Sequence, residues 1–597
     1  MTESAPETAE TPTSPALRGA RYLRLVVAGG VAALAVLMAI ASSLDYAFVK
    51  RHVDPFTVDR DADLSPAEFD AIVVRLRLLA LLLGLVVVLL IRFGRRFDRL
   101  AAAIVSSWWT SARRSPRALE GWARTEGPVH VLVLATSIVV GAALRIAFLD
   151  VPMRYDEAAT FNAFVAQPLY VSLANYSEPN NHLLHTLLVS LAVDALGDGE
   201  WAIRLPALIA GIATLPLSYV LARRLYNSTA ALLTAALVAS SSTLVEYSTN
   251  ARGYSLLVAL TIASLLAAAR VIETGSQGAW ATLALCSILG FYAIPTMAYA
   301  FGGVVGWIAG SQLLRGGSWR NVLVPLGWCV IAVAVGTALL YAPVIGASGI
   351  DAVASNRFVE PIGVGEFARG LPDHVWSTIA SWGRDIPVVL SVAFAAATIT
   401  SLVLTPRLSR FSVPPLVALV AWAALMIAAQ RVLPFTRVWL YLVPVVLATG
   451  AGFIGWVLEQ SRRGVRIGQV TAAAVAVTAS ILVLDAGSVR ASTETGSLPD
   501  ARAIASYLDA TLRPGDTVQA IGSDAILSYY LARRGRDDTP SLFFRRPGRR
   551  VFVVVNRTKG DQTLSSALAE LPAGITYGAP VHIRNWPSAR LYVVRTG

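Results

Sequence analysis

The sequence predicts an all-α membrane domain with about thirteen transmembrane helices, followed by a small α/β domain outside the membrane. Hydrophobic residues make up 55% of the chain and charged residues only 15%, and this composition excludes an ordinary soluble protein. The apolar residues gather in runs of about 20, the length at which a helix spans a bilayer. After residue 488 such runs no longer occur, which predicts a second, soluble domain.

The N-terminal part predicts a tail and two membrane helices. Residues 1–17 are rich in Thr, Pro, Ala and Glu and lack apolar periodicity, which is typical of a disordered segment. The apolar run 22–44 is longer than the roughly 7–15 residues of a signal-peptide core, so we expect it to stay as an anchor. A second run, 74–92, leads into a strongly basic segment, which belongs in the cytoplasm. Residues 18–127 are therefore two transmembrane helices and a basic cytoplasmic loop, and the tail is cytoplasmic.

The next run, 129–149, crosses outward and places an acidic loop, residues 150–182, on the external side. The run 183–196 has only about 14 residues, short of the ~20 that a spanning helix needs, so it predicts an interfacial or re-entrant helix. With this run not crossing, a set of later arginines falls on the cytoplasmic side, as the positive-inside rule requires. They are Arg223, Arg224, Arg315, Arg320, Arg407, Arg410, Arg462, Arg463 and Arg466.

Ten further runs predict transmembrane helices. They are 202–222, 229–247, 254–270, 279–297, 298–314, 321–344, 387–404, 413–430, 438–458 and 468–486. With the three earlier spans the count is odd, so residues 489–597 should lie outside, opposite the N-terminus. The predicted protein is a multi-pass protein of the plasma (inner) membrane.

Residues 489–597 carry shorter patterns, typical of a small basic α/β domain. The predicted helices are 500–512, 525–532 and 563–571, and the predicted strands are 517–521, 551–555 and 591–595. The net charge of the chain, +12, could suggest a nucleic-acid partner, but no nucleic-acid-binding motif is present. Cys286 and Cys329 both lie inside apolar runs, so the sequence predicts neither a disulfide framework nor a cysteine metal site.

A set of polar residues shares the predicted external surface, where charge beside a bilayer needs a reason. The set comprises Asp156, Glu157, Glu178, His182, His185, Glu200, Arg204, Asn250, Arg252, Tyr254, His374, Arg431 and Arg437. Arginine binds phosphate with a two-pronged fork. Acids, arginines and aromatic residues at the lipid boundary therefore suit a substrate with a phosphate head and a long apolar tail, besides the membrane lipid itself.

The order of these motifs resembles the integral-membrane glycosyltransferases of the GT-C class, in particular the protein O-mannosyltransferase and ArnT-like family. The resemblance lies in an Asp-Glu pair in the first large external loop, then SEPNNHLLHTLL, then LGDGEWAIRLPALIAGIATLPLSYVLARRLYN, then YSTNARGYSLL. It implies a GT-C fold with residues 128–488 as the catalytic domain. It also implies transfer of a hexose or pentose from a polyprenyl-phosphate donor to an extracytoplasmic acceptor, which could be a cell-envelope glycan, a lipid or a protein. The transfer would invert the anomeric carbon, with Asp156 as general base.

Several residues keep a second interpretation. Asp156 could instead cap the helix that follows it, and Glu157 could be catalytic or structural. The side chains of Glu178, His182 and His185 could hold a divalent metal, or the histidines could cap helix ends or hydrogen-bond a lipid head group. The arginines at 252, 431 and 437 could bind phosphate or merely anchor helix ends at the interface.

The pairing of Glu200 with Arg204 and two rival functions of the protein also stay open. Glu200 and Arg204 have the spacing of a helical i, i+4 pair. The rival functions are a transporter or flippase of a lipid-linked substrate and a non-catalytic envelope assembly protein.

Overall fold

The computed structural model describes residues 14–54, 63–354, 359–536, 538–543, 548–558 and 562–597. Most of the predicted tail, residues 1–13, lies outside the described residues. The first helix, α1, begins at Ser14, so residues 14–17, which were expected in the tail, are helical.

Nine helices among the described residues are long and apolar enough to cross a membrane. They are α1 (Ser14–Ala41), α3 (Pro66–Arg92), α5 (Pro128–Ala147), α9 (Glu200–Leu225), α12 (Tyr254–Thr274), α14 (Met297–Leu314), α15 (Trp319–Ser348), the continuous pair η3 (Thr436–Leu442) and α21 (Val443–Leu458), and α22 (Arg462–Ala486). A tenth is formed by α10 (Ser228–Ala239) and α11 (Ser242–Ser248), which meet at a bend of 60°. The chain is thus a multi-pass membrane protein.

The other three predicted spans are also helices, but short ones. They are α13 (Gln277–Ala293), α18 (Val388–Val403) and α20 (Pro415–Gln430), with 17, 16 and 16 residues. At about 1.5 Å per residue such helices reach roughly 25 Å, less than the ~30 Å of a hydrocarbon core. Length and composition alone therefore identify fewer spans than the thirteen predicted. The predicted interfacial helix is α8 (Leu183–Leu196).

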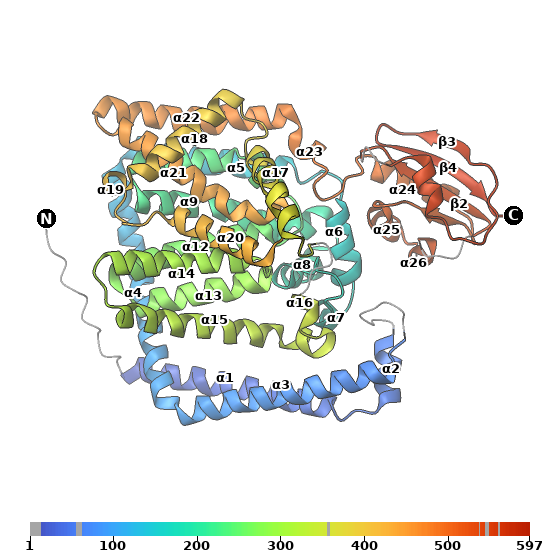
Figure 1. Ribbon diagram of the computed structural model, residues 1–597, viewed down its shortest axis with the longest axis horizontal. Helices are drawn as coiled ribbons and strands as arrows, with labels where there is room; N and C mark the ends of the chain where they lie inside the picture. The colour runs from blue at the N-terminus through green and yellow to red at the C-terminus, as the bar shows by residue number, and fades with distance from the viewer. Residues whose placement is uncertain (1–13, 55–62, 355–358, 537, 544–547, 559–561) are drawn as a thin grey trace.

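Two amphipathic helices replace segments predicted as loops. The basic segment after α3 is a helix of 33 residues, α4 (Gly94–Glu126), and the loop around residue 370, which was predicted to be external, contains α17 (Val364–Trp382). Figure 1 shows α4 running across one end of the bundle, roughly perpendicular to the membrane helices, and the short helix α19 (Thr405–Leu408) at the same end. Arg223, in the last turn of α9, pairs with Glu126 of α4. Arg224 pairs with Glu273 in the last turn of α12, and Arg315, directly after α14, donates to the carbonyl of Arg410, so basic residues from several loops meet at this end.

The opposite end of the bundle carries the acidic loop, which is largely helical (Figure 1). It contains α6 (Tyr155–Thr160), a π-helical turn η2 (Phe161–Val165) and α7 (Leu169–Ala174). Three further short helices complete the non-spanning parts of the chain: α2 (Tyr46–Val53), α16 (Asp351–Ala354) and α23 (Ser488–Ala491).

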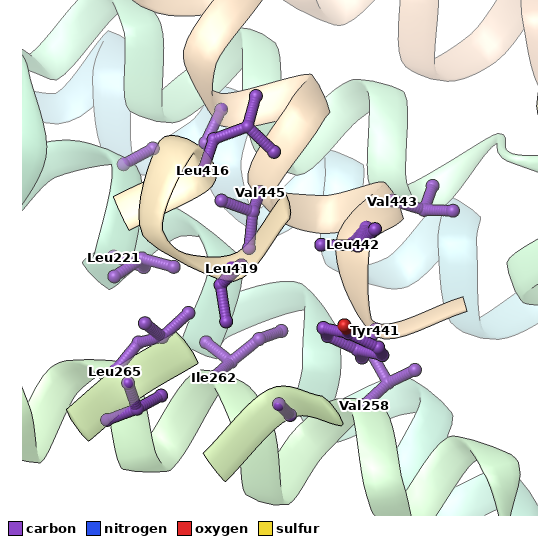
Figure 2. Packing of buried hydrophobic residues seen from close by; sticks show 14 of the residues in the cluster. Leu221, Val258, Ile262, Leu265, Leu416, Leu419, Tyr441, Leu442, Val443 and Val445 are labelled. Atoms are coloured by element: carbon purple, nitrogen blue, oxygen red, sulfur yellow. The ribbon is translucent and has the colours of Figure 1, made fainter. Parts of the chain in front are cut away.

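Small and branched apolar side chains let the central helices approach closely. Figure 2 shows Leu221 of α9, Ile262 of α12, Leu419 of α20 and Val445 of α21 in one buried cluster. A Cβ atom on Gly303 of α14 would lie 2.7 Å from the Cα atom of Leu419, so α14 and α20 pack with their backbones almost in contact. This dense core is a rigid support for the loops at its ends.

The C-terminal domain is a four-stranded sheet with helices, attached beside α6 (Figure 1). Its helices are α24 (Ala501–Thr511), α25 (Asp524–Ala532), α26 (Thr539–Leu542) and α27 (Leu564–Ala569), and its strands are β1 (Thr517–Gln519), β2 (Arg550–Asn556), β3 (Val581–Asn585) and β4 (Ala589–Arg595). The strand order is β1-β2-β4-β3, with β1 parallel to β2 and the other pairs antiparallel. Strand β3 was not predicted, because its sequence VHIRN has only two apolar residues, and all five of its residues are exposed.

Candidate functional site

Asp156 in α6 is flanked by two arginines from distant parts of the chain. Its Oδ2 atom lies 3.3 Å from Nη1 of Arg252 and 3.9 Å from Nη2 of Arg437. The Asp156 side chain is 21% exposed, whereas those of the arginines are 4% and 11% exposed. The site thus joins one reachable carboxylate to two nearly buried positive charges.

Arg252 stands in the turn between α11 and α12 with part of its guanidinium unsatisfied. Its Nη2 atom lies 3.4 Å from Nε2 of His182. Within the described part of the chain, neither Nε nor Nη1 has an acceptor in hydrogen-bond geometry, although Nη1 forms the ion pair with Asp156. A buried donor without a partner carries a large desolvation penalty, so these N–H groups are well placed for an anion.

Arg437 is held on several sides. Its Nε atom donates to the hydroxyl of Tyr254 at 3.2 Å and its Nη1 atom to the carbonyl of Glu494 at 3.3 Å. The guanidinium also lies over the ring of Phe435, 4.0 Å from the ring centre. These contacts leave Nη2 directed to Asp156, so the orientation of the guanidinium is fixed before any ligand binds.

His182 and His185 are both buried, and both favour the neutral form of the imidazole. Burial, and then the positive charge of Arg252, hold the pKa of His182 well below its ordinary value, and burial lowers the pKa of His185 to about 3. Nδ1 of His182 accepts the Gly253 N–H at 2.9 Å. Nε2 of His182 faces the guanidinium of Arg252, a position that disfavours a second cation.

The described residues contain no group of three His, Cys, Asp or Glu side chains that could hold a metal ion. Glu178, the third candidate ligand, is therefore not gathered with His182 and His185 into such a group. Its backbone carbonyl accepts the N–H of Asn181 at 3.1 Å.

Glu157 is enclosed completely, in contrast to its neighbour Asp156. Its carboxylate accepts two hydrogen bonds from Arg204, at 2.8 and 2.6 Å, and one each from the backbone N–H of Arg154 and of Ala251. Burial alone would raise the pKa of Glu157, but Arg204 and these N–H donors lower it below its ordinary value. The ion pair ties α6 to α9 and to the turn that carries Arg252.

The predicted pair of Glu200 and Arg204 is wrong. Arg204 is fully buried and pairs with Glu157, whereas Glu200 pairs with Arg502 and accepts a hydrogen bond from Tyr530. Both partners of Glu200 belong to the C-terminal domain, so tertiary contacts override the spacing along the helix.

The remaining predicted residues divide into two groups. Asn250 donates to the hydroxyl of Thr495 at 3.0 Å and, with Tyr254, borders the Asp156 cluster. His374 accepts a hydrogen bond from the indole of Trp439 at 2.9 Å. Arg431 ends α20 with a left-handed φ of 54° and is exposed. The structure thus gathers Asp156, Arg252, Arg437, His182, Asn250 and Tyr254, and gives His374 and Arg431 other surroundings.

Comparison with known proteins agrees with this architecture. Residues 179–341 match the family model described as dolichyl-phosphate-mannose-protein mannosyltransferase. ArnT from Cupriavidus metallidurans in the apo state is similar with a TM-score of 0.51 and 14% identity, over 80% of this chain and 98% of ArnT. The same ArnT bound to undecaprenyl phosphate gives a TM-score of 0.51 and 16% identity, over 78% and 97%. The chain has the GT-C fold. The family and fold matches together indicate a glycosyltransferase, and no curated protein sequence matches the chain.

The matched segment of this GT-C chain contains part of the site. It includes His182, Asn250, Arg252 and Tyr254 but not Asp156 or Arg437. Those two residues come from α6 and η3, on either side of the matched segment. The predicted fold class and the resemblance are confirmed, while the roles of single residues stay predictions.

Sequence reasoning missed a buried charge network behind the GT-C site. Glu246 of α11 pairs with Arg154 at 2.8 Å and with Arg384 at 2.6 Å. Arg145 of α5, also buried, donates to the carbonyls of Val238 and Ala239. Both carbonyls lie at the end of α10, so Arg145 supplies the hydrogen bonds that they lose at the bend between α10 and α11. Helix α11 then leads to the turn that carries Arg252. The available signal was an ionisable residue inside an apolar run, which is rare without a function or partner.

Proposed function

We propose that the chain transfers a sugar from a polyprenyl-phosphate donor to an extracytoplasmic acceptor, with Asp156 as general base. The observation that carries this proposal is a reachable carboxylate beside two nearly buried arginines, one of which has an Nε–H group without an acceptor among the described residues. The similar ArnT binds undecaprenyl phosphate, which supports a donor of the same chemical class. The sugar would be a hexose or a pentose, and the acceptor a glycan, lipid or protein of the cell envelope.

In the proposed reaction the Asp156 carboxylate takes the proton of an acceptor hydroxyl. The acceptor oxygen then bonds to the anomeric carbon while the bond from that carbon to the phosphate oxygen breaks. Polyprenyl phosphate leaves with the electron pair, and Arg252 and Arg437 offset its negative charge. A single displacement inverts the anomeric carbon. We assign Glu157 a positioning role, because its enclosed carboxylate has no access to a substrate.

The proposed orientation has the N-terminus in the cytoplasm and both the Asp156 end and the C-terminal domain outside. The gathering of basic loop residues at the end opposite α6 supports it. Modification of single introduced cysteines with a membrane-impermeant reagent tests it, and labelling of position 150 only from the cytoplasmic side would contradict it.

The experiment that tests the function uses the purified full-length protein and a panel of polyprenyl-phosphate hexoses and pentoses. We expect release of free polyprenyl phosphate from at least one donor when an acceptor fraction of the cell envelope is present. A transporter would move the lipid across vesicles without cleaving it, and an assembly protein would do neither. Release by no member of the panel would favour one of these rivals.

Replacing Arg437 with Gln should lower kcat/KM for the donor by roughly 10- to 100-fold, since hydrogen bonds to charged groups contribute about 1.5–3 kcal/mol. Steady-state kinetics with varied donor would measure this change. Arg431→Gln is the matched control, because Arg431 is exposed and outside the cluster, and we expect less than about a twofold change from it. Equal losses in the two variants would withdraw Arg437 as a phosphate ligand.

Removal of divalent metal should leave transfer unchanged, because Nδ1 of His182 already accepts a hydrogen bond and its Nε2 faces a guanidinium. The measurement is donor turnover before and after dialysis against EDTA, followed by addition of magnesium or manganese. A loss with EDTA that either ion restores would revive the site of Glu178, His182 and His185.

A further inference from the structure

We propose that the linker between the two domains, residues 492–498, is a positioning element of the active site, and that the C-terminal domain is thereby part of the catalytic unit. This inference rests on the proposed function, because it concerns the placement of Asp156. It assigns a role to a domain whose sequence carries no catalytic motif.

The linker completes the helix that bears Asp156. The first N–H groups of a helix have no partner within that helix. In α6 the N–H of Tyr155 donates to the carbonyl of Gly496 at 3.0 Å, and the N–H of Asp156 donates to the carbonyl of Thr495 at 3.1 Å. The backbone position of the proposed base is therefore set by the linker.

The same short stretch also holds two neighbours of Asp156. The hydroxyl of Thr495 accepts the side-chain N–H of Asn250, and the carbonyl of Glu494 accepts Nη1 of Arg437. Thr495 is only 2% exposed, so water does not compete for its bond with Asn250. A displacement of the linker would shift α6, the Arg252 turn and Arg437 together.

The far end of the linker is fixed in the C-terminal domain. Asn556, at the end of β2, and Thr558 both donate to the carbonyl of Ser497, at 2.8 and 2.9 Å. The domain also contacts α6 and its surroundings directly, because the hydroxyl of Tyr530 accepts the N–H of Met153 at 2.9 Å. The loop that carries Asp156 is thus held between the linker and α25.

Gly496 gives a sharp test. Its φ is +74°, and a Cβ atom there would lie 2.5 Å from the Cβ atom of Tyr155. Gly487, a few residues earlier, has a similar φ of +63° but nothing within 4 Å of an added Cβ. Alanine at either position strains the backbone, but only Gly496→Ala pushes the linker away from α6.

We expect Gly496→Ala to lower kcat at least about 10-fold, because small misplacements of reacting groups cost up to 10²-fold, and to raise the donor KM, because the linker also holds Arg437. Gly487→Ala should keep kcat within about threefold of wild type, since strain alone does not move Asp156. Melting temperature and gel filtration would be compared for both variants. Equal kcat for Gly496→Ala and wild type, or equal losses in both variants, would overturn the proposal.

Thr495 provides a second route if Gly496→Ala does not fold. Thr495→Val removes the acceptor for Asn250 and should lower kcat, whereas Thr495→Ser keeps the hydroxyl and should restore it. Equal kcat in the Val and Ser variants would contradict the role of Thr495. Wild type is measured in the same assay, so that failure of wild type to release polyprenyl phosphate refutes the proposed function itself, while normal wild-type turnover with unaffected linker variants refutes only the linker role.

Discussion

Asp156→Asn should lower kcat for sugar transfer by about 10²- to 10⁴-fold, the range that a general base contributes. Asparagine keeps the size of the side chain and can still lie between Arg252 and Arg437, but it cannot take a proton from the acceptor. Donor binding should survive, because both arginines keep their positive charge. The measurement is single-turnover release of polyprenyl phosphate, together with donor binding followed by thermal shift.

Asp150→Asn is the matched control for this change. Asp150 belongs to the same acidic loop, but its side chain is 87% exposed and its carboxylate lies 3.2 Å from Arg502. We expect its kcat to stay within about twofold of wild type, as exposed ion pairs contribute little. Near-normal turnover by Asp156→Asn would withdraw Asp156 as the general base. The predicted alternative for Asp156, a helix cap, is wrong, because the N-cap of α6 is Arg154 and its N–H donates to the Glu157 carboxylate.

The second large effect should be on stability. Glu157→Gln leaves the fully buried guanidinium of Arg204 without its counter-charge, and breaking a buried pair in this way lowers the free energy of unfolding by about 3–5 kcal/mol. The melting temperature of the purified variant would report this loss. The matched control is Glu273→Gln, whose pair with Arg224 is 31% and 25% exposed, and which should lower the free energy of unfolding by less than about 1 kcal/mol.

A double variant and a pH series refine this prediction. Glu157→Gln with Arg204→Met should recover part of the loss, because the unpaired charge is removed as well. Since the pKa of Glu157 is lower in the folded state, the stabilisation by this pair is complete above the pKa of the unfolded state, about 4.3. It is lost as the pH falls through the lower, folded pKa. No recovery in the double variant would mean that Glu157 matters for its shape and hydrogen bonds rather than its charge.

The membrane helices were predictable because a helix that crosses the hydrocarbon core of a bilayer needs about 20 apolar residues, and such runs are visible in the sequence. The same rule could not find α4 and α17, which are amphipathic and contain no uninterrupted run of about 20 apolar residues. In the C-terminal domain, buried β2 was visible as five successive branched or aromatic residues, 551–555, while exposed β3 was not.

The site was predictable in part, by motif rather than by geometry. Arg431 and Arg437 flank the same predicted external turn, and the sequence could not separate them. In the structure the left-handed backbone at Arg431 ends α20 in an exposed position, while Arg437, the second residue of η3, lies beside Asp156. Likewise, spacing along α9 could not reveal that Arg204 reaches Glu157. The hydrogen bonds to the linker carbonyls could not be predicted, because every residue has a backbone carbonyl and the sequence does not show which ones accept.

The backbone bonds between α6 and the linker also set an order of assembly. Synthesis starts at the N-terminus, so Tyr155 and Asp156 emerge long before Thr495 and Gly496. Until then the first N–H groups of α6 lack the partners that they have in the finished protein. Contacts between such distant parts of a chain form late in folding. A nascent or prematurely ended chain can therefore insert its membrane helices while the helix that carries Asp156 is still incomplete, and completing this helix is one of the last events in its biogenesis.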